Sequence, residues 1–216
     1  TFPIDYQVAL ISKLGIPIKD PKPIIHISDA WRKSAHELLI SKNYDPKKPY
    51  CIIHPGARKY DQWQFEKFAK IMEYFFTRFN LGIILTCGPG QFDQVERLTQ
   101  YLSKEVPYTF ISTELSVLLG ITANAKFVVC HNGGYMHAVS AIGVPLTALF
   151  GLTDYRIWKP SGETSVVLHK DIDCWPCTSK TMKQVCWNGK PECKELISAQ
   201  DVIDSIKKLC PEFSDK

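Results

Sequence analysis

The protein has 216 residues, of which 45% are hydrophobic, 22% charged and 12% aromatic. This length suits one ordinary domain with an appendage, and this balance excludes a disordered or collagen-like chain. The formal net charge is +4, from 26 Lys and Arg against 22 Asp and Glu. Such a charge favours an anionic ligand or a phospholipid surface, but basic residues this dispersed do not indicate nucleic-acid binding.

No apolar run reaches the roughly 18 residues that a membrane-spanning helix needs. The N-terminus also lacks the basic flank and apolar stretch of a secretion signal. We therefore expect a cytosolic chain.

The first twenty residues have the pattern of a segment that precedes a fold rather than begins one. Val8, Leu10, Ile11 and Leu14 predict a short amphipathic helix. Gly15 is suited to the cap at its C-terminus, and the prolines that follow prevent its continuation.

Helical and strand patterns then alternate along the chain. One helix is expected at 29–41, capped by Ser28 or Asp29, and the last at 198–209, capped by Ser198. Between them, strands are expected at 50–54, 82–87, 108–111, 126–130, 145–150 and 165–169, and helices at 64–79, 92–103, 114–123 and 135–142. This alternation predicts an α/β fold, a Rossmann-like doubly wound parallel sheet whose ligands bind outside the carboxyl ends of the strands.

The loop after the first strand carries two cations. The sequence HPGA is followed by Arg58 and Lys59 just before a helix, an arrangement that can present backbone N–H groups and positive charge to a phosphate. A polar loop with exposed basic side chains explains the same residues equally well. The glycine-rich turn after the second strand, CGPGQFD, lacks the G-x-G-x-x-G spacing of a dinucleotide site.

The fourth strand runs into the sequence HNGGYMH. Gly133 and Gly134 allow a tight turn and leave the first N–H groups of the following helix unobstructed, as in helix N-termini that bind a diphosphate. His137 can donate to the same anion or lie in the core. After the fifth strand, Thr153 and Asp154 offer a hydroxyl and a carboxylate, or form an Asx-type turn with a tryptophan packed beneath it.

These motifs, in this order and at these intervals, resemble one enzyme family. HPGA, the GPG turn, HNGGYMH and VPLTALFGLTD, with Trp158 and Pro160 behind, are similar to the C-terminal half of the family 9 glycosyltransferases over 22–209. These bacterial enzymes are the ADP-heptose:lipopolysaccharide heptosyltransferases and their relatives. The resemblance implies the C-terminal, donor-binding domain of a GT-B glycosyltransferase, with the acceptor and a catalytic Asp in an N-terminal half. It also implies an inverting transfer that requires no metal.

The resemblance divides the chain into an interdomain connection at 1–21, a nucleotide-sugar-binding domain at 22–173, and a Cys-rich segment with a C-terminal helix at 174–216. An acceptor domain needs well over about a hundred further residues, so we expect a donor-binding half that is inactive alone. Its parent would transfer heptose or a related sugar from an ADP-sugar to a lipid-linked, lipopolysaccharide-type saccharide. Such an acceptor implies work at the inner face of the inner membrane, with peripheral membrane contact.

Family site residues can be carried over position by position. At the end of the fourth strand the family shows Asp, then Ser or Thr, then Gly, and a His three residues later. The corresponding residues here are Asn132, Gly133, Gly134 and His137. Asn still accepts a hydrogen bond but cannot carry the charge of the carboxylate that it replaces.

A second departure lies in the first loop, where the family tends to carry a Lys two residues before the tryptophan, against the donor diphosphate. Asp61 occupies that position, so Arg58 or Lys59 would supply the charge instead. Gln91 or Asp93 stands where the family binds the donor ribose. Because both the Asp and the Lys are lost, a catalytically inactive nucleotide-sugar binding module is the alternative function. A nucleotide-dependent oxidoreductase is disfavoured because the first turn lacks its glycine pattern.

The chain contains eight cysteines, which a cytosolic protein is not expected to pair as disulfides. Cys51, Cys87 and Cys130 fall in or beside apolar strands and are expected to be small buried residues. The spacing of Cys174, Cys177, Cys186 and Cys193 permits a structural zinc site of four thiolates. Because the second pair lacks C-x-x-C spacing, unliganded thiols are the alternative. Transfer itself requires no cofactor under the resemblance.

Overall fold

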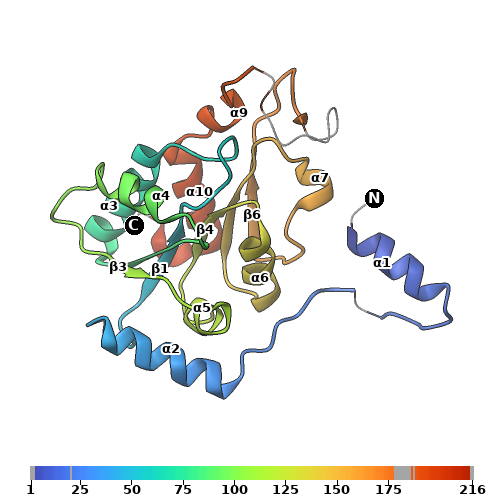
Figure 1. The fold of residues 1–216 in the computed structure, drawn as a ribbon, viewed down its shortest axis with the longest axis horizontal. Helices are drawn as coiled ribbons and strands as arrows, with labels where there is room; N and C mark the ends of the chain where they lie inside the picture. Colours follow the sequence, from blue (N-terminus) through green and yellow to red (C-terminus); the bar gives the residue numbers. More distant parts are fainter. Residues whose placement is uncertain (1–2, 20, 178–185, 187, 215–216) are drawn as a thin grey trace.

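Six parallel strands form the centre of the protein. The computed structural model describes residues 3–19, 21–177, 186 and 188–214. The strands are β1 (Tyr50–His54), β2 (Gly82–Thr86), β3 (Thr109–Ile111), β4 (Val128–His131), β5 (Leu146–Leu149) and β6 (Ser165–Leu168). Their order in the sheet is β3-β2-β1-β4-β5-β6, the order of a Rossmann fold (Figure 1). The predicted doubly wound sheet is confirmed, and every strand lies within two residues of its expected bounds.

Helices cover both faces of this sheet, as expected from the alternation. The described residues form the helices α1 (Pro3–Ser12), α2 (Asp29–Ser41), α3 (Phe65–Phe79), α4 (Phe92–Thr99), α5 (Leu115–Thr122), α6 (Gly134–Ile142), α7 (Tyr155–Trp158), α9 (Glu192–Glu195) and α10 (Ala199–Leu209), followed by the 3₁₀ helix η1 (Pro211–Phe213), and all but α1, α7 and α9 place buried residues against the sheet. The helix expected at 92–103 ends at Thr99, and Leu102 packs against the core from the turn behind it. None of the helices in the described ranges is long and apolar enough to cross a membrane.

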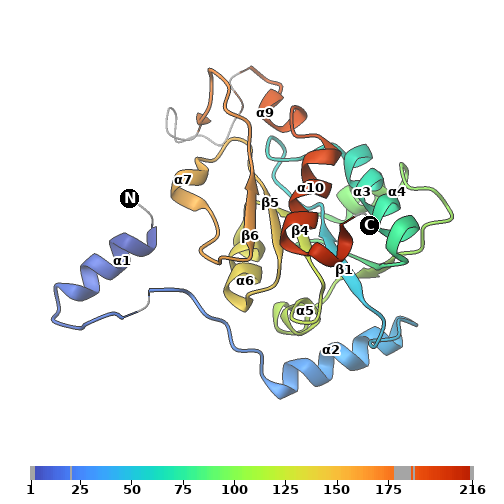
Figure 2. The ribbon, with the colours of Figure 1, turned by 180° about the vertical axis from the view of Figure 1, so that it is seen from behind.

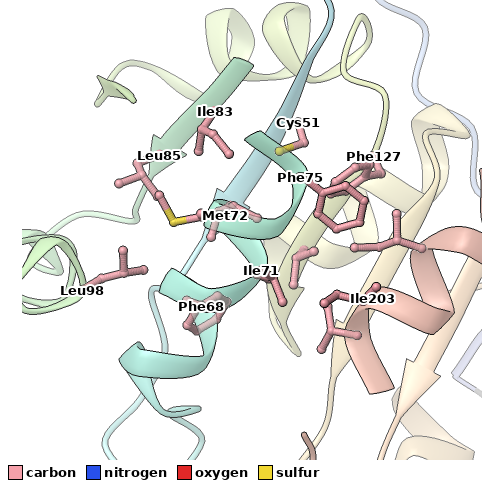
Figure 3. Close-up of a cluster of buried hydrophobic side chains, with 14 of the residues drawn as sticks. Cys51, Phe68, Ile71, Met72, Phe75, Ile83, Leu85, Leu98, Phe127 and Ile203 are labelled. Carbon is pink, nitrogen blue, oxygen red and sulfur yellow. The ribbon is translucent and has the colours of Figure 1, made fainter. Parts of the chain in front are cut away.

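Two hydrophobic cores lie on opposite faces of the sheet, because successive strand residues point to opposite sides. Cys51 and Ile53 of β1 face α3, α4 and α10, whereas Tyr50 and Ile52 face α2, α5 and α6. Figure 3 shows part of the first core, with Phe75 of α3 beside Phe127, the two ring centroids 4.8 Å apart. The C-terminal helix α10 contributes Val202, Ile203 and Ile206 to this core, so it packs with the sheet.

The N-terminal helix α1 lies apart from the sheet, next to α7, at the end of an extended segment (Figures 1 and 2). It begins at Pro3, earlier than the apolar pattern indicates, and the chain reaches the left-handed conformation at Gly15 (φ 77°) after the helix has ended. Tyr6 and Leu10 are 67% and 55% exposed. Little of its apolar surface is therefore covered.

Candidate functional site

The loops that carry the sequence motifs meet at one edge of the sheet. β1 and β4 are neighbours, with His54 paired with Cys130, and the strand order reverses between them. Chain segments leave the two strands toward opposite faces at such a point, which opens a crevice between the following loops. The loops after β1 and β4 therefore form the candidate site.

The loop after β4 leaves the start of α6 uncovered. The N–H of Asn132 donates to the carbonyl oxygen of Leu149 at 3.2 Å, and Gly133 follows in an extended conformation with φ 173°. Among the described residues, no side chain caps α6, and a Cβ atom added at Gly133 or Gly134 would meet none of them within 4 Å. The chain bends at Asn132 and Gly133, between β4 and α6, and the two glycines leave the first N–H groups of the helix uncovered by the described residues.

The loop after β1 is fixed against α4 by two glutamines. Gln94 accepts a hydrogen bond from the Ala57 N–H (2.9 Å) and donates one to the Ala57 carbonyl oxygen (3.0 Å). Gln91 Oε1 accepts from the Gly88 N–H at 3.0 Å and lies against Gly56, where a Cβ atom would clash with it. Of the two predicted ribose-binding residues, Gln91 thus lies between the two loops, whereas Asp93 is exposed on the first turn of α4.

The two cations predicted for the phosphate have different surroundings. Arg58 forms an ion pair with Asp61, with its Nη2 atom 2.9 Å from Oδ2. Asp61 is only 3% exposed, and its Oδ1 atom has no hydrogen-bond partner among the described residues. Lys59 is exposed, with its ammonium 5.4 Å from the ring centroid of Tyr60. The positive charge of Arg58 is therefore partly neutralised by Asp61, the residue at the position of the family lysine.

A buried lysine that the sequence analysis missed lies at the same edge. Lys194 of α9 is 1% exposed, and its Nζ donates to the Leu149 carbonyl oxygen at 2.8 Å. Burial lowers its pKa to about 8, and the nearby negative charge of Asp61 opposes this shift. A lysine after a cysteine carries no recognisable sequence signal, because its burial depends on how α9 packs.

Two histidines with lowered pKa values end β1 and β4 at this edge. His131 Nε2 accepts a hydrogen bond from the Trp63 N–H at 2.9 Å, and its Nδ1 atom has no partner among the described residues. Burial, together with the charge of Lys194, lowers the pKa of His131 well below its usual value. His54 stacks on Tyr135, with ring centroids 4.9 Å apart, and burial lowers its pKa to about 4. Both histidines fall within the loop motifs HPGA and HNGGYMH, but the motifs gave no role for either.

His137 lies outside the core, so the interior alternative for it is wrong. The residue is exposed and lines a cavity of about 260 Å³ together with Ile4, Gln7 and Trp158. The open alternative at Asp154 is decided in favour of the turn, because its carboxylate caps α7 and binds Arg156 through two hydrogen bonds of 2.9 and 2.7 Å. Trp158 is 46% exposed rather than packed beneath that turn.

The cysteines fall into the two expected groups. Cys51, Cys87 and Cys130 are buried, which confirms their prediction. In the Cys-rich segment, burial and the neighbouring thiols of Cys177, Cys186 and Cys174 raise the pKa of Cys193 to about 11.

Within the described ranges, no group of three or more His, Cys, Asp or Glu residues is placed to hold a metal ion. Residues 178–185 and 187 of the predicted Cys-rich segment lie outside those ranges. The zinc site at Cys174, Cys177, Cys186 and Cys193 therefore stays a prediction.

A comparison with protein families shows to which family this chain belongs. The model of glycosyltransferase family 9 (heptosyltransferase) matches residues 4–188. The chain belongs to glycosyltransferase family 9. This membership confirms the resemblance that the loop motifs indicated.

Individual family 9 relatives agree with this assignment. The chain is 26% identical to lipopolysaccharide heptosyltransferase 3 of Escherichia coli (strain K12), over 97% of this chain and 60% of the relative. A crystal structure of a family 9 glycosyltransferase from Veillonella parvula DSM 2008 matches with a TM-score of 0.77 and 20% identity, over 96% of this chain and 60% of that one. The structure of the E. coli ADP-heptose lipopolysaccharide heptosyltransferase II matches with a TM-score of 0.72 and 16% identity, over 91% of this chain and 55% of that one. The chain thus spans about 60% of the length of the family members it matches.

Proposed function

We propose that this chain binds the nucleotide diphosphate sugar donor of a family 9 heptosyltransferase, with ADP as the nucleotide. The observation that carries the proposal is the uncovered N-terminus of α6, with its two open glycines, at the point where the strand order reverses. Backbone N–H groups and the helix dipole favour an anion at such a position. The name of the E. coli ADP-heptose enzyme supports ADP-heptose or a related sugar as the donor class.

The chemistry of the site follows from the charge that develops during transfer. When the bond between the sugar and the diphosphate breaks, negative charge accumulates on the leaving nucleotide. The N–H groups of Gly133 and Gly134, and a cation of the first loop, Arg58 or Lys59, stabilise this charge more strongly than they stabilise the intact donor. Asn132 and His137 flank the same turn of the chain. No step requires a metal ion.

The complete enzyme, in this proposal, transfers heptose or a related sugar to a lipid-linked saccharide of the lipopolysaccharide type. The name of the E. coli lipopolysaccharide relative supports this acceptor class. A second domain would bind the acceptor and supply the catalytic base, and the enzyme would act in the cytoplasm at the inner face of the membrane.

Substitution at Gly133 tests the donor site. An extended backbone accepts any residue, and a Cβ atom there meets no atom of the described part of the chain within 4 Å, so Gly133→Leu is expected to fold normally while covering the start of α6. By isothermal titration calorimetry, we expect the native chain to bind ADP more tightly than GDP, UDP or adenosine. Gly133→Leu should weaken ADP binding by about tenfold or more, a change of about 1.4 kcal/mol or more.

Gln100→Leu provides the matched control. Gln100 is exposed and follows the C-terminal end of α4, whereas the loops of the site lie at the N-terminal end of that helix. This variant should bind ADP as the native chain does. Unchanged ADP affinity in Gly133→Leu, with an unchanged melting temperature, would show that the diphosphate binds elsewhere.

A further inference from the structure

The buried charge of Lys194 is only partly compensated within the protein. Its ammonium has three donors, yet its single hydrogen bond within the described ranges is to the neutral carbonyl of Leu149, and it forms no ion pair there. The negative charge that acts most strongly on it is that of Asp61, whose carboxylate is already bound directly by Arg58 at 2.9 Å. An uncompensated buried cation is costly, so its presence calls for a partner.

This ammonium lies directly behind the uncovered start of α6. Lys194 Nζ and the Asn132 N–H donate to the same Leu149 oxygen, at 2.8 and 3.2 Å, and Gly133 and Gly134 follow Asn132 in the chain. Both overall views place α9 at the end of the sheet where the loop after β1 lies (Figures 1 and 2). The ammonium therefore lies beside the turn that carries the open N–H groups, because both donate to the carbonyl of Leu149 or follow a residue that does.

The position of the lysine is fixed by packing. A Cβ atom added at Gly151 would lie 2.7 Å from Lys194 Cε and 2.9 Å from its Cγ, so the backbone of the loop after β5 presses against the stem. This close packing restricts the stem, and the side chain is 1% exposed. Its charge is consequently a preorganised part of the site, and such charges cost no reorganisation when an anion binds.

We propose that Lys194 is a positioning residue of the donor site, which holds the turn after β4 through the Leu149 carbonyl and supplies fixed positive charge to the donor diphosphate. Asp61 moderates that charge from the loop after β1. The inference rests on the proposed function and adds to it a residue from the Cys-rich segment, far from the loop motifs in sequence. A bound diphosphate is the partner that the buried ammonium lacks.

Two substitutions with opposite expected effects on ADP affinity test the inference. Lys194→Met keeps the length of the side chain and removes the charge, so ADP binding should weaken about tenfold while adenosine, which has no phosphate, binds as before. Asp61→Asn removes the opposing charge and should tighten ADP binding about threefold, again with adenosine unchanged. Lys190→Met is the matched control, because Lys190 is a surface lysine of the same segment with a side chain 68% exposed; it should change ADP affinity by less than about twofold.

The outcomes separate the inference from the proposed function. If the native chain shows no preference for ADP over adenosine, the donor site itself is wrong, and the role of Lys194 falls with it. If the native chain prefers ADP but Lys194→Met binds ADP equally well, only the role of Lys194 is wrong. A purely structural role would make both variants lose ADP and adenosine affinity together. Should Lys194→Met fail to fold, Lys194→Gln takes its place, because it keeps a donor for the Leu149 carbonyl and removes the charge; ADP binding equal to that of the native chain would then overturn the inference.

Discussion

At the scale of single residues, burial controls protonation at the edge of the sheet. His54 is held against Tyr135 with a pKa lowered to about 4, and His131 is lowered in the same direction. Unfolded histidines bind a proton near pH 6.5. Between that pH and the folded pKa, the unfolded state binds more protons than the folded state, so stability falls as the pH falls.

We therefore expect the free energy of unfolding to decrease between pH 7 and pH 5, by about 2 kcal/mol from His54 alone. Urea unfolding at the two pH values measures this loss. In His54→Phe the ring contact with Tyr135 remains but the titrating group is gone, so this variant should lose correspondingly less stability on acidification. The same pH dependence in the variant and in the native chain would contradict the account.

Sequence patterns located some of these residues but not their partners. Gly133 and Gly134 could be placed at the end of the fourth strand, because a glycine pair between a strand and a helix is a local pattern. Lys194 could not, because its burial depends on contacts with Leu149 and the neighbourhood of Asp61, both distant in sequence. The pairing of Arg58 with Asp61 is local, but the burial of that carboxylate is again a tertiary effect.

At the scale of elements, the C-terminal helix is part of the sheet's core. Its start was predictable, because Ser198 and Asp201 form a capping box, with Ser198 Oγ accepting from the Asp201 N–H at 3.0 Å. Its position beside α3 was not, since periodicity shows which residues are apolar but not what they pack against. The position of α1 next to α7, away from the sheet, was unpredictable for the same reason.

Truncation of a buried side chain of α10 should therefore destabilise the whole chain. Ile206 is fully buried in the core that α10 shares with α3, so Ile206→Ala should lower the free energy of unfolding by about 3 kcal/mol. Lys208→Ala, on the exposed side of the same helix, should change it by less than about 0.5 kcal/mol. Chemical denaturation followed by circular dichroism measures both. Equal small effects would mean that α10 is not integral to the fold.

At the scale of the whole molecule, the order of the motifs predicted the architecture correctly. Motifs that lie far apart in the chain fall at the carboxyl ends of β1, β2, β4 and β5, because a parallel sheet brings all these ends to one edge. That rule does not predict that the C-terminal segment also contributes to this edge. It arises because α10 packs in the core beside α3, and α9 with Lys194 lies just before it in the chain.

In this proposal the start of α6 receives the diphosphate of the donor. A crystal structure of this chain with ADP tests it most directly. We expect phosphate oxygens within hydrogen-bond distance of the N–H groups of Gly133 and Gly134, near the Leu149 carbonyl to which Lys194 donates. A diphosphate bound at another edge of the sheet, or a start of α6 that stays vacant at saturating ADP, would contradict it.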